Sequence, residues 1–343
     1  MKGLLSALAA AALGCGCLVA QNPSAGGDDP NEIDSQPMVV FANTVRDLLN
    51  REKFAELENI AATVRSSRSR FAGGAWKLNA FYNTVQGPGY LTAADAVWTA
   101  HIARLNRWVA AYPASPTPRI ALAQAYLRYS WKARGHGYAK TVTENGWQLF
   151  NSRTKQAQSV LEAAASLSPK DPQWFRLMQE VALAQSWPRE QENQLVESAM
   201  AIEPGYFYLY VAQANYLSTR WFGKEGEAEA FADSIADRIG GDNGSFVYYR
   251  IAEAMDCCGK KDLLPALSWD RIKQGFSAIE NLYGSLNYQR NVMAYLALRH
   301  GDREFASQMF SRIGDDWSAS VWRTKANFDG RIVEDAEAPA TTK

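Results

Sequence analysis

The stretch WKARGHGYAKTVTENGW, residues 131–147, gathers side chains that could bind a ligand or move a proton. His136 stands between two glycines, which let a backbone approach a ligand closely. Arg134 and Tyr138 add hydrogen-bond donors suited to an anionic group. His136 could act as a general base if an acid or a nucleophile lay within about 3 Å, and Glu144 is the nearby acid. The stretch therefore has three interpretations: a connection that His136 and Tyr138 fasten onto the helix pair, a binding loop, or an acid–base site.

A second candidate is RWFGKEGEAEAF, residues 220–231, in which Trp221 precedes three glutamates. Carboxylates favour the positive end of a helix dipole, so a well-capped helix start is one interpretation. A site for a cation or an amine, built from the glutamates and Trp221, is the other. Together the two stretches supply these candidate binding residues: Arg134, His136, Tyr138, Trp147 and Trp221.

Several common chemical motifs are absent from the sequence. It contains no HExxH, GxSxG or CxxC pair, no phosphate loop, no dinucleotide fingerprint and no calcium loop. We therefore predict no catalytic residue, no metal and no cofactor, although two carboxylates distant in sequence could still meet to hydrolyse a sugar. The 36 basic and 36 acidic residues cancel. A neutral chain lacks the basic excess on which nucleic-acid affinity depends, so that partner class is disfavoured.

The N-terminus, MKGLLSALAAAALGCGCLVAQ, has one lysine, an apolar run and then small residues, which is typical of a secretory signal. The run is too short for a spanning helix, so the mature chain is predicted to have no transmembrane span. Two cleavages compete. Cleavage before Cys15 would leave a lipid-anchored lipoprotein, and cleavage after Ala20 would leave a mature chain without a lipid. In both cases we expect export, with the protein periplasmic, secreted or anchored to a membrane.

The composition predicts four segments after this assignment: a signal at 1–20, a flexible linker at 21–36, a single helical-repeat domain at 37–330 and a disordered tail at 331–343. The linker and the tail hold almost nothing to bury. Inside the predicted domain, the adjacent Cys257 and Cys258 could close only a small strained ring with each other. They are interpreted as packing residues, with a redox switch as the alternative.

Apolar residues recur at helical spacing along the folded region. Trp98, Ile102, Leu105, Val109 and Tyr112 follow one another at intervals of four and three. Helix starts are indicated where a capping side chain precedes proline, at Thr117-Pro118 and Asp171-Pro172, and where Thr92 and Asp95 resemble a capping box. His101, inside a helix, and His300, at a helix end where a cation suits the dipole, are interpreted as structural.

A repeat of 35 residues follows from the helix ends at Pro169, Pro204 and Gly240. Each interval holds two helical patterns, such as 172–186 and 189–202. The preceding interval is 21 residues longer, and the surplus falls between predicted helices at 118–134 and 148–167. The sequence thus predicts an all-α fold of stacked antiparallel helix pairs, a tetratricopeptide-like solenoid, with residues 131–147 as an insertion on one face.

Several runs resemble a bacterial family known as domain of unknown function 4034. They include RFAGGAWKLNAFY, YSWKARGHGYAKTV with GWQLF, DPQWF, YLSTRWFGKEGEAEAF and, more weakly, YLALRHGDREFASQMFSRIGDDW. The resemblance spans most of the predicted domain and implies a tetratricopeptide-like helical protein. It implies no activity and no catalytic residues.

From these patterns we expect an exported, non-enzymatic scaffold that binds an unidentified protein or peptide in the cell envelope. The alternative is an envelope hydrolase that uses His136 or a carboxylate pair as acid and base. A third interpretation is a spacer without a binding surface.

Overall fold

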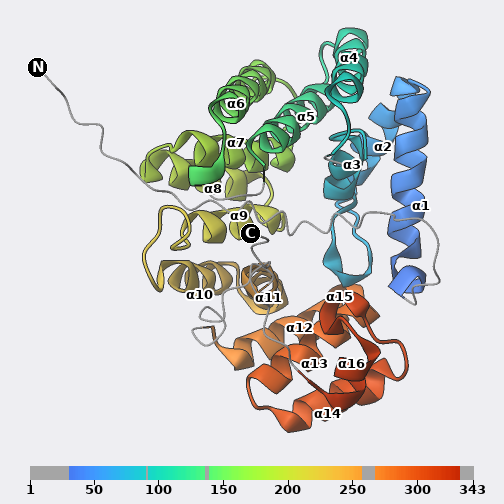
Figure 1. The fold of residues 1–343 in the computed structure, drawn as a ribbon, viewed down its shortest axis with the longest axis vertical. Coiled ribbons are helices and arrows are strands. Elements are labelled where there is room, and N and C mark those ends of the chain that lie inside the picture. The colour runs from blue at the N-terminus through green and yellow to red at the C-terminus, as the bar shows by residue number, and fades with distance from the viewer. Residues whose placement is uncertain (1–30, 90–91, 136–138, 257–266, 333–343) are drawn as a thin grey trace, which may run out of the picture. The chain divides into compact units, whose positions relative to one another are not determined.

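Every regular element in the computed structural model is helical (Figure 1), over described residues 31–89, 92–135, 139–256 and 267–332. Within them, the sole β-type pairing is an isolated bridge between Arg70 and Trp76. The predicted all-α class is confirmed. The predicted signal peptide, with Cys15, lies outside the described residues, as do Cys257 and Cys258.

The helices of the first part of the chain are α1 (Asn31–Asn50), α2 (Phe54–Ser66), η1 (Ala72–Gly74), α3 (Lys77–Val85), α4 (Asp95–Ala111), α5 (Pro116–Arg134), η2 (Ala139–Thr141) and α6 (Glu144–Ala164). Those of the second part are α7 (Pro172–Gln185), α8 (Arg189–Ile202), α9 (Tyr208–Tyr216), α10 (Glu227–Ile239), α11 (Gly241–Asp256), α12 (Trp269–Tyr283), α13 (Asn287–Arg299), α14 (Arg303–Ile313), α15 (Ala319–Trp322) and α16 (Lys325–Gly330).

The chain divides into two compact units. Among the described residues, unit 1 comprises 46–63 and 82–231, and unit 2 comprises 31–45, 64–81 and 232–332. The boundaries between them fall inside α1, α2, α3 and α10. The expectation of a single domain over 37–330 stays a prediction.

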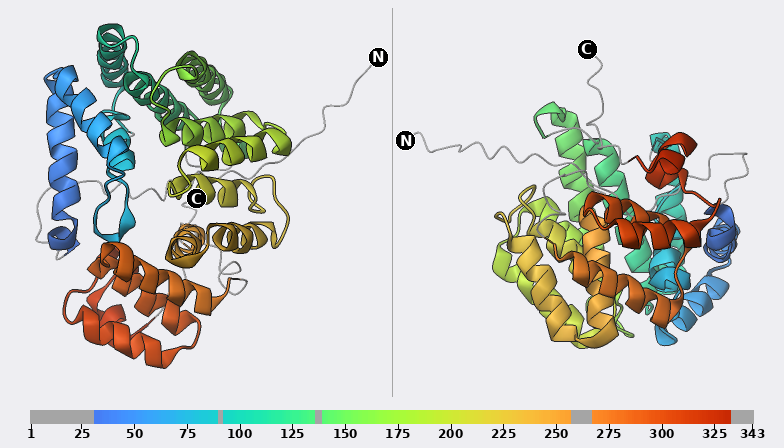
Figure 2. Two further views of the ribbon diagram at one scale, coloured as in Figure 1. Left: turned by 180° about the vertical axis from the view of Figure 1, so that it is seen from behind. Right: turned by 90° about the horizontal axis from the view of Figure 1, so that it is seen from below.

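In unit 1, successive helices from α4 to α9 pack against one another as antiparallel neighbours (Figures 1 and 2). The predicted pair at 172–186 and 189–202 corresponds to α7 and α8. These two helices contain 14 residues each, which is the short helix pair that the repeat predicts. Helix pairing of this kind is confirmed.

The predicted helix N-caps are correct at α7 and wrong at α5. Asp171 caps α7 as predicted, because its Oδ1 accepts the backbone N–H of Gln173 at 2.9 Å. The prediction at Thr117-Pro118 was wrong. Ser115 is the cap instead, accepting from the Thr117 N–H at 3.2 Å with Pro116 as the first helical residue. Ser115 precedes a proline too, so the same rule applies two residues earlier.

The start of α4 also differs from its prediction. Ala94 precedes the helix without a side-chain cap, so Thr92 and Asp95 form no capping box. The side chain of Asp95 lies instead beside Lys132 of α5, with which it forms an ion pair. The carboxylate that the capping box would have used is paired with a lysine on the neighbouring helix.

The surplus of 21 residues before α7 is largely helical. α5 and α6 contain 19 and 21 residues, so both are longer than α7 and α8. The connection between them covers only 135–143, of which 136–138 lie outside the described residues. The predicted insertion at 131–147 therefore includes the last turn of α5 and the first turn of α6 at its two ends, with the connection 135–143 between them.

In unit 2, glycines allow close contacts at two places along α12. A Cβ on Gly275 of α12 would lie 2.4 Å from the carbonyl oxygen of Ser245 and 2.5 Å from the Cβ of Tyr249, both on α11. At η1, Gly73 and Gly74 have positive φ angles of 75° and 84°, a conformation that favours glycine. The Gly73 N–H donates to the Gly284 carbonyl at 2.7 Å, which fastens η1 beside the end of α12.

Replacing Gly275 with alanine is expected to lower the free energy of unfolding by about 2 kcal/mol. The added methyl group would push α11 and α12 apart, which outweighs the better helix propensity of alanine. Urea unfolding followed by circular dichroism measures the difference. Gln274→Ala, at an exposed position of the same helix, is the control and should change stability by less than about 0.5 kcal/mol. Equal stability of G275A and Q274A would show that this contact is not tight.

The helical region begins before the predicted boundary at residue 37. Helix α1 starts at Asn31, inside the predicted linker of 21–36, and contains Pro37. A helix can extend into a polar segment because propagation needs backbone hydrogen bonds and not apolar side chains.

Candidate binding site

Three of the predicted binding residues lie together in unit 1. Arg134 ends α5, Trp147 lies in the first turn of α6, and Trp221 lies in the connection after α9. Trp131 of α5 joins them, with its ring 6.4 Å from that of Trp221 at an interplanar angle of 83°. Phe150 of α6 completes the group. We call these five residues the tryptophan cluster.

Phe150, which is buried, meets the rings of Trp131 and Trp147 edge to face, and Trp131 in turn meets Trp221. The ring centroid of Phe150 lies 5.0 Å from that of Trp131 and 5.8 Å from that of Trp147. The Arg134 guanidinium carbon lies 5.4 Å from the Trp131 ring and 5.5 Å from the Trp147 ring. Edge-to-face ring contacts and cation–π contacts both stabilise this arrangement.

The ends of α5 and α6 are locked together next to the cluster. Thr143 caps α6 by accepting the Gly146 N–H at 3.0 Å. A Cβ on Gly146 would lie 2.9 Å from the Ala133 carbonyl oxygen, so glycine lets the start of α6 approach the end of α5. This contact fixes Arg134 and Trp147 on facing turns.

Charge within the cluster is largely shielded from water. Arg134 is only 4% exposed, and this burial lowers the pKa of its guanidinium, which donates to the Gly135 carbonyl at 3.1 Å. The Trp131 indole N–H donates to the Glu180 carboxylate of α7 at 2.9 Å. Glu180 also pairs with Arg176 at 3.4 Å. The cluster is thus held from α7 as well as from α5 and α6.

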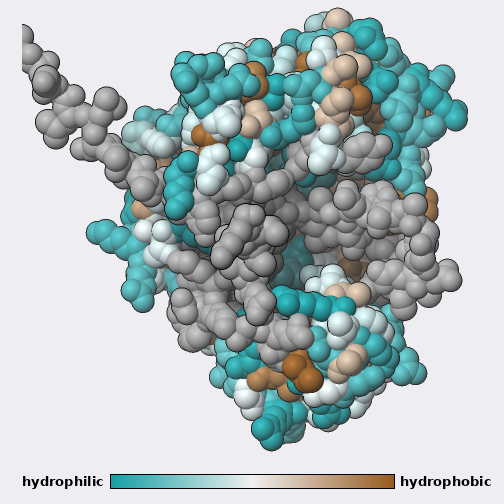
Figure 3. All heavy atoms as spheres, viewed as in Figure 1, coloured by the Kyte–Doolittle hydropathy of each residue, from teal (hydrophilic) through white to brown (hydrophobic). Residues whose placement is uncertain are grey.

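The three cluster tryptophans keep part of their surface in solvent. All three are half-buried, whereas Trp76, Trp98, Trp108 and Trp322 are fully buried. On the face drawn in Figure 3, hydrophilic residues cover most of the described surface and hydrophobic residues occur in small, separate groups. Unit 1 thus gathers three half-buried tryptophans from three segments.

Comparisons with protein-family models, with curated proteins and with solved structures found no match. The resemblance to domain of unknown function 4034 accordingly stays an expectation, and the site must be judged on its geometry.

Two of the predicted site residues, His136 and Tyr138, lie outside the described residues. The acid–base alternative at His136 therefore stays a prediction. Glu144, its nearby acid, is exposed at the first residue of α6, and the Gln148 amide donates to it at 3.4 Å. The binding interpretation depends on Arg134, Trp147 and Trp221.

The cation site suggested around Trp221 is not formed by Glu227. Its carboxylate accepts two bonds from the Arg189 guanidinium, at 3.1 and 2.8 Å, and one from the Lys224 N–H at 2.9 Å. Hydrogen bonding to Arg189 and Lys224 lowers the pKa of Glu227 to about 2. Glu227 is the first residue of α10, as the helix-start interpretation expects.

The two histidines that the structure describes have structural surroundings. His101 is 5% exposed, and its Nε2 lies 2.9 Å from the Val85 carbonyl oxygen. His300 stacks on Trp269 with centroids 4.8 Å apart. Burial lowers the pKa of both rings. The neutral form of His300 is therefore favoured, contrary to the cation that its place at a helix end predicts.

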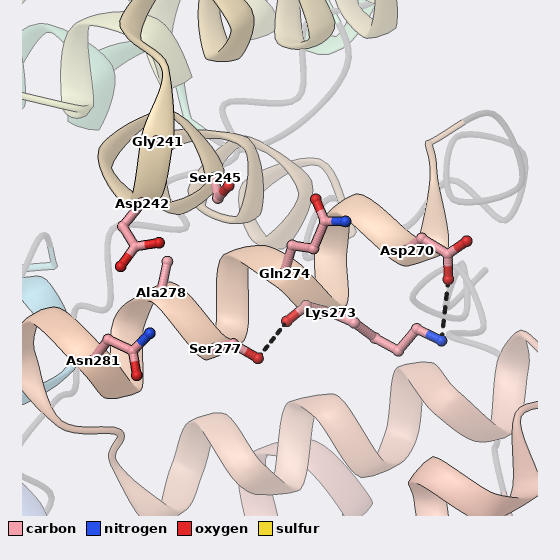
Figure 4. Close-up of a pocket in the computed structure, with 9 residues that line it drawn as sticks. All are labelled: Gly241, Asp242, Ser245, Asp270, Lys273, Gln274, Ser277, Ala278 and Asn281. Carbon is pink, nitrogen blue, oxygen red and sulfur yellow. Dashed lines mark hydrogen bonds and ion pairs between the residues drawn. The ribbon is translucent and has the colours of Figure 1, made fainter.

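Unit 2 carries a polar groove of about 700 Å³ between the first turn of α11 and one face of α12 (Figure 4). Its lining residues are mostly polar: Gly241, Asp242, Ser245, Asp270, Lys273, Gln274, Ser277, Ala278 and Asn281. Lys273 pairs with Asp270 at 3.2 Å and with Asp302 at 3.1 Å. The lining includes no aromatic side chain, so the groove offers hydrogen bonds without a stacking surface.

One buried acid belongs to none of the motifs found in the sequence. Glu192 of α8 is 1% exposed, and neither carboxylate oxygen has a hydrogen-bond partner among the described residues. Burial raises its pKa to about 7, against smaller opposing effects of Gln179 and Arg176. A signal did exist: Glu192 lies on the same helix face as Val196 and Ala199, at spacings of four and three.

Two further observations concern the described part of the chain alone. No helix there combines the length and the apolar character that crossing a membrane requires. No three histidine, cysteine, aspartate or glutamate side chains come together there as metal ligands.

Proposed function

We propose that this chain is an exported, non-enzymatic helical-repeat protein that binds a peptide or protein partner in the cell envelope through the tryptophan cluster. The observation that supports this most is the meeting of Trp131, Trp147 and Trp221, from three segments, with part of each ring exposed. Tryptophan and arginine are the residues most enriched among those that dominate binding energy at protein interfaces.

The geometry suits recognition of an apolar or aromatic side chain. Rigid rings held by Phe150 and by the bond from Trp131 to Glu180 lose little conformational entropy when a partner binds. Arg134 lies against two of the rings and does not project freely, so its role is to hold them and to favour a partner of negative or neutral character.

Trp221→Ala is expected to weaken partner binding at least about tenfold, because it removes one wall of the surface and leaves α5 and α6 intact. The partner is first captured by crosslinking to the wild-type protein in envelope extracts and identified. Its affinity for purified wild type and variant is then measured by calorimetry.

The matched control is Trp187→Ala. Trp187 is also half-buried in unit 1, and its indole N–H donates to Gln185 outside the cluster. Equal weakening by both variants would argue against the cluster as the binding surface. Turnover of envelope material by the wild type that is lost in His136→Ala would overturn the proposal in favour of the hydrolase.

A further inference from the structure

Three buried side chains on α7, α8 and α9 present hydrogen-bond acceptors that are not satisfied by the described residues. They are Gln179, Glu192 and Gln213, each no more than 2% exposed. Both oxygens of Glu192 and the amide oxygens of the two glutamines have no donor. Burying acceptors without donors is costly, and Glu192 is the one of the three that can remove this cost by taking up a proton.

Each of the two glutamine amides uses one of its two N–H groups elsewhere. The Gln179 amide nitrogen donates to the Leu209 carbonyl at 3.1 Å, and that of Gln213 donates to the Asn193 side-chain oxygen at 3.1 Å. The Gln179 amide is still close enough to the Glu192 carboxyl to oppose the rise of its pKa, although no hydrogen bond of good geometry joins the two. A proton on Glu192 would turn one acceptor into a donor and would remove a buried charge at the same time.

The charges around Glu192 are few. Arg176 faces it from α7, and Tyr216 faces it from α9. Arg176 is shared with Glu180, at 3.4 Å. One turn earlier on α8, Arg189 is engaged by Glu227 of α10 at 2.8 Å. The ionised form of Glu192 therefore depends on one cation that another carboxylate also holds.

The start of α8 also holds the segment that carries Trp221. Arg189 donates to the Phe222 carbonyl at 3.0 Å. The Tyr216 hydroxyl donates to the Trp187 carbonyl at 3.2 Å, just before α8 begins. Displacement of α8 would thus disturb hydrogen bonds that hold the chain before and after Trp221, at Tyr216 and at Phe222.

We infer that Glu192 is a proton-operated switch: the protonated carboxyl keeps α8 packed between α7 and α9, and its ionisation loosens α8 and the Trp221 segment. Because folded Glu192 has a pKa of about 7 and an ordinary value of 4.5, openings that expose it should become about tenfold more populated between pH 6 and pH 8. Any effect on partner binding rests on the function proposed above, whereas the switch itself does not.

Hydrogen–deuterium exchange, measured peptide by peptide and corrected for intrinsic rates, tests the switch in the full-length protein without a partner. In the wild type, the α8 amides should lose about tenfold in protection from pH 6 to pH 8. In Glu192→Gln, which cannot ionise, protection should not change. Glu190→Gln, an exposed acid on the same helix, should behave as the wild type.

An unchanged pH response in E192Q, or no response in the wild type, would overturn the inference. Carbon-13 titration of glutamate carboxyls in the wild type covers the case in which E192Q fails to fold. One resonance should titrate near pH 7, and titration of all of them below about pH 5.5 would also overturn it. Failure of partner binding with an intact pH response would count against the proposed function alone.

Discussion

Glu192→Gln is expected to raise the free energy of unfolding by about 3 kcal/mol at pH 8 and to change it little at pH 5. The glutamine has nearly the shape of the acid but carries no charge. At pH 8 the wild type must bury an ionised carboxylate that no described donor satisfies, and the variant need not.

The sign of this pH dependence follows from the number of protons that the folded and unfolded states bind. The pKa of Glu192 is about 7 in the folded protein, above its ordinary value of 4.5, so the folded state binds more protons between these two values. The contribution of protonated Glu192 to the free energy of unfolding is therefore complete below about pH 4.5, and it is lost progressively as the pH rises to about 7. Above that, both states are ionised and the wild type keeps the full penalty.

Denaturant unfolding of wild type and E192Q at several pH values measures the effect, with Glu190→Gln as the control for removing a negative charge. E190Q should stay within about 0.5 kcal/mol of the wild type at each pH. A stabilisation by E192Q that is equal at pH 5 and pH 8 would mean that it comes from packing and not from ionisation.

Asn291→Ala is expected to lower the free energy of unfolding by about 4 kcal/mol. Asn291 of α13 is fully buried in unit 2. Its side-chain oxygen accepts from the Ser318 N–H at 3.0 Å and from the Trp322 indole N–H at 2.9 Å. Its nitrogen donates to the carbonyls of Asn287, at 3.0 Å, and Asp316, at 3.2 Å.

Alanine would remove the side chain that makes four hydrogen bonds in this region, two of them from the Ser318 N–H and the Trp322 indole N–H at α15. The Ser318 and Trp322 donors would lose this acceptor while buried, and a cavity would form where the amide was. Guanidinium unfolding monitored by circular dichroism gives the difference. Asn281→Ala, an exposed asparagine of α12, is the control and should be nearly neutral. A loss below about 1 kcal/mol for N291A would show that water replaces the amide.

The two surfaces described here differ in what they could recognise. The tryptophan cluster offers rigid aromatic faces, and the groove of unit 2 offers amides, hydroxyls and charges without an aromatic wall. Interfaces gain most of their binding energy from a few aromatic or arginine residues that become fully desolvated. For that reason the cluster, and not the groove, supports the proposed binding function.

Much of the fold was predictable from local sequence. Apolar spacing and the 35-residue period predicted helices 172–186 and 189–202, which match α7 and α8 closely, and Asp171 before Pro172 predicted the correct cap. These features depend on backbone geometry within a few residues, so the sequence carries them directly. The same rules misplaced the starts of α4 and α5, where a neighbouring serine or a cross-helix ion pair decided the outcome.

The sequence alone also predicted Arg134, Trp147 and Trp221 as candidate binding residues, but it did not predict that they lie close to one another. Their meeting depends on the approach of α6 to α5 at Gly146 and on the position of the connection after α9. The burial of Glu192 was visible as an acid on an apolar stripe. Its raised pKa, however, comes from burial, and that burial requires α8 to pack against α7 and α9 in the tertiary structure. Local preference determined the helices, and only tertiary packing decided which side chains share an environment, because burial and contact depend on residues that the local sequence does not contain.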